Sequence, residues 1–116
     1  MKKIEIINKV TEINVEVVNI LEKLENENEF KSFIDKFYLE VGRNSDNFRS
    51  VMSYYHGGRR IEDFISGVNY YMNTMDEDDI TCEQAREDLK VMKKLNKTLE
   101  DNFHISSTIK LFQMYD

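Results

Sequence analysis

The sequence contains no proline or tryptophan, only four glycines and a single cysteine. The scarcity of glycine and proline argues against a turn-rich all-β chain, because tight turns depend on both residues. One cysteine excludes an internal disulfide and a zinc site built from several cysteines. No apolar run approaches the roughly 18 residues of a membrane-spanning helix. We therefore expect a cytoplasmic protein that does not associate with membranes.

Length and charge narrow the class of protein further. The 116 residues, 41% apolar and 33% charged, suffice for one folded domain over 1–116 with its own core. The net charge of −6 disfavours binding to nucleic acid or anionic lipid. The abundance of Lys, Asn, Ile and Glu suits an AT-rich genome or its phages and mobile elements.

Apolar residues recur at helical spacing along most of the chain, which predicts an all-α fold. Short connections favour a single-domain antiparallel helical bundle or an orthogonal helical array of five to six helices, with sequential helices as neighbours. The expected helices span about 3–27, 28–41, 45–56, 60–75 and 82–103, followed by a short C-terminal helix or turn at about 106–115.

Three local signals refine this prediction. Asn28 is a candidate cap for the second helix. Thr81 and Gln84 fit a capping box at the start of the fifth helix. Gly67 lies inside the fourth helix, where its missing side chain predicts the close approach of another backbone.

The first helix carries apolar residues in a heptad pattern. This seam has two interpretations: it packs inside the bundle, or it forms a homodimer seam or a partner-binding helix. The seam residues are Ile6, Val10, Ile13, Val17, Ile20 and Leu24.

Arginine and tyrosine gather around the glycine pair that separates the third and fourth helices. Guanidinium groups bind carboxylate or phosphate, and tyrosine rings pack on a partner or stack on a base. The segment is therefore a plain helix–helix turn, a protein contact or a phosphate-binding corner. The candidate partner-binding residues are Arg43, Arg49, Tyr54, Tyr55, Arg59 and Arg60.

A second candidate partner-binding region is the acidic connector before the fifth helix, formed by Asp76, Glu77, Asp78 and Asp79. The connector lacks the ligand spacing and the central glycine of a calcium loop, so we expect no metal there. It belongs to an acidic stretch from residue 62 to residue 88. This stretch is either a solvated helix surface or a mimic of nucleic-acid phosphates.

No pattern of catalytic residues emerges. Cys82 needs a base to act as a nucleophile, and nothing in the sequence places His56 or His104 beside it. We therefore expect no enzyme, with no catalytic residues and no cofactor. The favoured function is a small non-catalytic protein-interaction module that acts as a regulator, adaptor or inhibitor, of phage or mobile-element type. The alternative is a nucleic-acid or phosphate-binding protein that uses the arginine-rich surface around 43–60.

Overall fold

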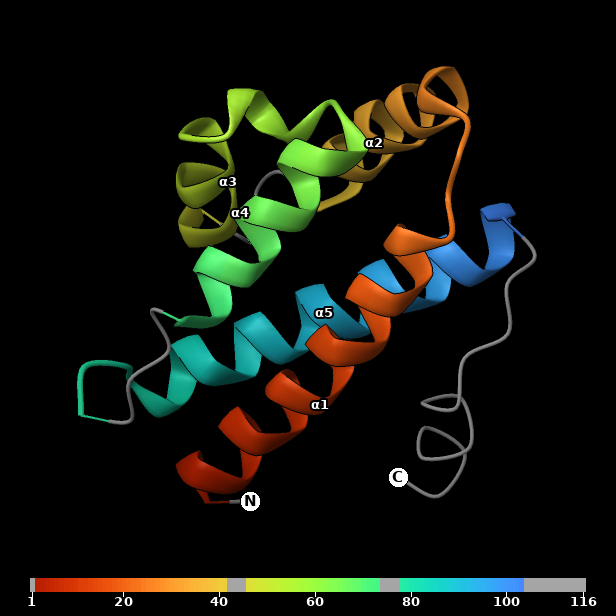
Figure 1. The fold of residues 1–116 in the computed structure, drawn as a ribbon. Coiled ribbons are helices and arrows are strands. Elements are labelled where there is room, and N and C mark those ends of the chain that lie inside the picture. The colour runs from red at the N-terminus through yellow and green to blue at the C-terminus, as the bar shows by residue number, and fades with distance from the viewer. Residues whose placement is uncertain (1, 42–45, 74–77, 104–116) are drawn as a thin grey trace.

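The computed structural model describes residues 2–41, 46–73 and 78–103, and it confirms the predicted all-α fold over these ranges (Figure 1). A short 3-10 turn, η1 (His56–Gly58), separates the third helix from the fourth. The predicted C-terminal helix or turn at 106–115 lies outside the described residues. The described residues form five α-helices, which are α1 (Lys3–Glu22), α2 (Glu27–Val41), α3 (Asp46–Ser53), α4 (Ile61–Asn73) and α5 (Cys82–Phe103).

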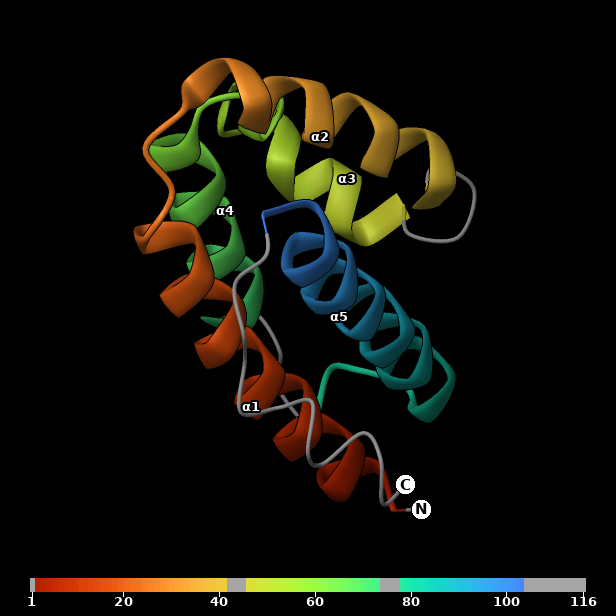
Figure 2. The same cartoon turned by 90° about the vertical axis from the view of Figure 1, so that its right-hand side faces the viewer.

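The longest two helices, α1 and α5, lie side by side and run in the same direction, as both views show (Figures 1 and 2). α1 packs most extensively against α5 and next against α4. The arrangement is therefore a helical array and not an antiparallel up-and-down bundle. The expectation that sequential helices are neighbours is wrong for α1 and α2, because α1 packs against α5 and α4 instead.

The heptad seam of α1 lies inside the core of the chain. Five of its six side chains are at most 4% exposed, and Leu24 is half-buried just beyond the helix end. The intramolecular interpretation accounts for this burial, since α1 packs against α5 and α4. The buried side chains are consequently not available to a second copy of the chain in this structure.

The chain turns between α1 and α2 earlier than predicted. α1 ends at Glu22, and not near residue 27, and the side-chain oxygen of Asn26 accepts a hydrogen bond from the backbone N–H of Glu29 at 3.0 Å. Asn26 is therefore the cap of α2 and the prediction of Asn28 is wrong, because Asn28 already lies within the first turn of the helix. The predicted cap of α5 is confirmed, as Thr81 Oγ1 accepts the N–H of Gln84 at 3.1 Å.

An aromatic cluster ties α2, α3 and α4 together. Phe48 of α3 is its centre, with edge-to-face contacts to Phe37 of α2 and to Phe64 and Tyr71 of α4, at centroid distances of 5.4 to 6.1 Å. Such pairs add stabilisation beyond the burial of their surface. The short helix α3 is thus held by one fully buried ring that reaches two neighbouring helices.

The prediction that another backbone approaches Gly67 is wrong, because side chains and not a backbone come close to it. A Cβ at this position would collide with the sulfur of Met52 and approach the ring of Tyr55. α3 therefore packs directly onto the backbone of α4 at this point.

Polar side chains are also buried in the core. Asp88 of α5 is only 3% exposed, and its Oδ2 has no hydrogen-bond partner in the described ranges. Burial raises the pKa of Asp88 from 3.8 to about 6, while the neighbouring Tyr71 hydroxyl acts in the opposite direction and the Glu87 carboxylate raises the pKa further. Asn96 is completely buried, and neither atom of its amide has a partner within the described part of the chain.

Candidate functional site

The connection between α3 and α4 is a tight turn with unusual backbone geometry. His56, Gly57 and Gly58 all have positive φ, at 57°, 72° and 65°. Glycine adopts this region readily, whereas a residue with a Cβ is strained there. The turn is closed by the N–H of Gly58, which donates to the carbonyl of Tyr55 at 2.9 Å.

A tyrosine of α2 attaches this turn to the rest of the fold. The hydroxyl of Tyr38 donates a hydrogen bond to the carbonyl of Gly57 at 2.7 Å. Gly58 is buried next to it, and a Cβ at Gly58 would lie 2.8 Å from a ring carbon of Phe64 and 3.2 Å from the Tyr38 oxygen. The path of the backbone after α3 therefore requires glycine at this position.

Between α2, α3 and this turn runs an open groove of about 460 Å³, which we call the α2–α3 groove. Each helix contributes residues at positions i, i+3 and i+4, which lie along one helix face. The lining residues are Asp35, Tyr38 and Leu39 of α2, Arg49, Met52 and Ser53 of α3, and Gly57 and Arg59 of the connection.

The groove carries positive charge. Burial raises the pKa of the Tyr38 hydroxyl above its ordinary range, and the nearby guanidinium groups of Arg49 and Arg59 act in the opposite direction. Two arginines that are ten positions apart in the sequence are thus brought to the same phenol. Within the described residues, Arg59 has no ion-pair partner, and Asp35 is the single acid among the groove's lining residues given above.

A large apolar side chain is exposed in the lining of the same groove. Leu39, which lines it, is 85% exposed, and Tyr54, which directly follows the lining residue Ser53, is 79% exposed. The half-buried Tyr55, in contrast, packs against the ring of Tyr70 of α4 at a centroid distance of 6.0 Å. Large apolar groups at such exposure mark surfaces that contact other molecules when they cluster next to a groove.

The structure separates the predicted partner-binding residues. It brings Arg49 and Arg59 together, and it leaves Arg60 exposed at the start of α4 but outside the lining of the groove. Asp78 and Asp79 are exposed before α5. Three of the predicted residues lie outside the described residues, namely Arg43, Asp76 and Glu77.

The α2 side of the groove was missed from the sequence. Asp35, Tyr38 and Leu39 lie on a helix whose apolar stripe draws attention to its buried phenylalanines. The available signal was Leu39 itself, a leucine that falls off that stripe and is therefore expected in solvent.

The acidic stretch from residue 62 to residue 88 does not form one solvated surface. Its last acid, Asp88, faces the core, and Asp63 is half-buried. Acids gather instead along a smaller groove of about 370 Å³ between the α1–α2 connection and α4, where Glu22, Glu25, Glu27 and Glu62 are lining residues. One of them has a structural role, since Glu27 Oε2 accepts the backbone N–H of Ile61 at 3.1 Å and so caps α4.

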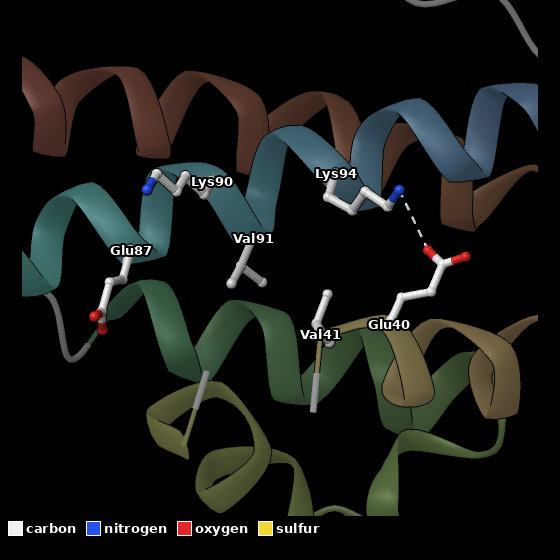
Figure 3. Close-up of a pocket in the computed structure, with 6 residues that line it drawn as sticks. All are labelled: Glu40, Val41, Glu87, Lys90, Val91 and Lys94. Atoms are coloured by element: carbon white, nitrogen blue, oxygen red, sulfur yellow. Dashed lines mark ion pairs between the residues drawn. The ribbon is translucent and has the colours of Figure 1, made fainter. Parts of the chain in front are cut away.

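A larger groove, of about 560 Å³, lies between α5 and the end of α2 (Figure 3). Val41 and Val91 point toward each other across it, and Lys94 Nζ forms an ion pair with Glu40 Oε2 at 3.3 Å. Its other lining residues are Glu87 and Lys90, so its acids and bases balance. Because its charges balance, this groove attracts a charged ligand less strongly than the α2–α3 groove does.

Groups able to support catalysis are dispersed in the described part of the chain. There, no three side chains of His, Cys, Asp or Glu come together as metal ligands would. Neither His56 nor Cys82 lines any of the three grooves, and His104 lies outside the described residues. In the ranges that the structure covers, no helix is both long and apolar enough to cross a bilayer.

In comparisons with known proteins, the chain matches no family model, and no curated protein or solved structure is detectably similar to it.

Proposed function

We propose that the chain is a small non-catalytic protein-interaction module that acts as a regulator, adaptor or inhibitor of another protein. It binds this partner through the α2–α3 groove. The observation that carries the proposal is the exposure of Leu39 in the lining of a groove that holds two guanidinium groups, with Tyr54 exposed one residue after the lining residue Ser53. Protein interfaces combine such exposed apolar anchors with arginine.

The same surface favours a protein over a nucleic acid. Asp35 lines the groove and would repel a phosphate backbone, as would the net charge of −6. A leucine side chain that is mostly exposed has little to contact on a backbone of phosphates, whereas it fits an apolar pocket of a protein.

The experiment is capture of the partner by the tagged chain from lysate of the source cells, with and without nuclease, followed by mass spectrometry. We expect a stoichiometric protein that survives nuclease. The variants Leu39→Ser and Tyr54→Ser should lose it, because each removes an exposed anchor without disturbing the core.

The matched control is Val15→Ser. Val15 is an apolar residue of α1 that is 53% exposed, far from the groove in the sequence and on another helix. Partner capture that is lost equally in all three variants would contradict the proposal. Capture that disappears with nuclease would favour the nucleic-acid alternative instead.

A further inference from the structure

This inference rests on the proposed function and names the chemistry of the bound segment. We infer that the α2–α3 groove recognises a linear segment of a partner protein in which an acidic side chain adjoins an aliphatic or aromatic one. The groove is bounded by two helix faces, each contributing residues at i, i+3 and i+4, so it is elongated and suits a peptide in extended or helical form.

The two arginines that line the groove indicate that the bound segment of the partner carries an acidic side chain. Arg49 and Arg59 both line the groove together with Tyr38, and both guanidinium groups act on its hydroxyl. Arg59 is exposed and has no ion-pair partner within the described ranges. A carboxylate of the partner is the group that a guanidinium binds with two parallel hydrogen bonds.

The apolar lining residues Leu39 and Met52 indicate that the bound segment of the partner also carries an apolar side chain. Leu39 lines the groove and is 85% exposed, while Met52 is a buried lining residue. A leucine or aromatic side chain of the partner that covers Leu39 would remove its exposed surface from water. Methionine adapts its shape to such a neighbour because its side chain is unbranched and flexible.

Asp35 limits how acidic the segment can be. It lines the same groove from α2, one turn before Tyr38, and opposes a second negative charge there. The groove thus favours a segment with a few acids placed beside apolar residues over a uniformly anionic chain.

The test is selection of a displayed library of short random peptides on the purified full-length chain, followed by fluorescence anisotropy of the enriched peptides. We expect the enriched peptides to combine an aspartate or glutamate with a neighbouring apolar residue. The variant Arg59→Glu should weaken their binding by about tenfold or more, since a charge-assisted hydrogen bond is replaced by repulsion.

The matched control is Arg60→Glu, which makes the same charge change at the adjacent residue, exposed and outside the groove. Equal weakening by both variants, or enriched peptides no more acidic than the starting library, would overturn the inference. Circular dichroism spectra that match the wild-type spectrum establish that both variants fold.

Other occupants give distinct results. If light scattering shows a dimer that Arg59→Glu dissociates, a second copy fills the groove and the inference is wrong. If the partner protein depends on Leu39 and Tyr54 but the selected peptides lack acids, the inference fails while the proposed function stands. If no partner depends on Leu39 or Tyr54, the proposed function itself fails.

Discussion

The buried carboxyl group of Asp88 predicts that this protein loses stability as the pH rises toward neutrality. The pKa of Asp88 in the folded chain is about 6, compared with an ordinary value of 3.8. Between about pH 4 and pH 6 the unfolded chain releases this proton while the folded chain retains it, so the free energy of unfolding falls as the pH rises. Above about pH 6 both states are ionised and the contribution stays constant.

The magnitude follows from the difference between the two pKa values. Each pKa unit corresponds to about 1.4 kcal/mol, so the ionised Asp88 costs the folded state about 3 kcal/mol at neutral pH. The variant Asp88→Asn removes the charge and keeps the size of the side chain. Its amide N–H groups lack a partner, which costs about 1 kcal/mol. We therefore expect Asp88→Asn to be about 2 kcal/mol more stable than wild type at about pH 7 and slightly less stable at about pH 4.

Urea unfolding followed by circular dichroism over this pH range measures both profiles. The control is Glu87→Gln, the same kind of change at the exposed neighbouring residue, which should keep most of the wild-type slope because it leaves Asp88 buried. If wild type and Asp88→Asn differ by the same free energy at both pH values, the carboxyl group is not perturbed by burial and the reasoning is refuted.

Three further predictions concern the turns, and urea unfolding measures each. Gly58→Ala should destabilise the fold by about 2 kcal/mol or more, because the new Cβ would lie 2.8 Å from a ring carbon of Phe64 at a positive φ; an unchanged midpoint would contradict this. His56→Gly should stabilise it by about 1 kcal/mol, since glycine relieves the strain of a φ of 57°, and a loss of stability would refute the strain. Glu27→Ala should cost about 1 kcal/mol by removing the cap of α4, whereas Glu29→Ala, at an exposed position of the same helical turn, should cost less.

The apolar periodicity predicted the helices well because each helix buries one face. The stripes of α2 and α5 are buried almost as expected, and the cap at Thr81 was correctly identified because its capping box is a local pattern. Helix ends were harder to predict where several neighbouring polar residues could each serve as the cap, as in the segment from residue 25 to residue 29. There Asn26 caps the helix, while Asn28 has an identical side chain two positions later.

The arrangement of the helices lay beyond the sequence. An amphipathic stripe predicts that one face of a helix is buried, but it does not identify the element that packs on that face. The seam of α1 was therefore compatible both with a second copy of the chain and with α5. The groove had the same difficulty, because Arg49 and Arg59 meet only through the turn at residues 56–58, and their neighbours Asp35 and Leu39 come from a third segment. Asp88 was counted as a surface acid, since its buried position depends on which face of α5 the other helices cover.

The central claim is that the α2–α3 groove binds a protein partner, and the most direct test is an NMR titration of the isotope-labelled chain with the captured partner. We predict that the largest changes in backbone amide shifts fall at residues 35–39, 49–54 and 57–59. Changes confined to the outer surfaces of α1 and α5, with these three segments unaffected, would contradict it.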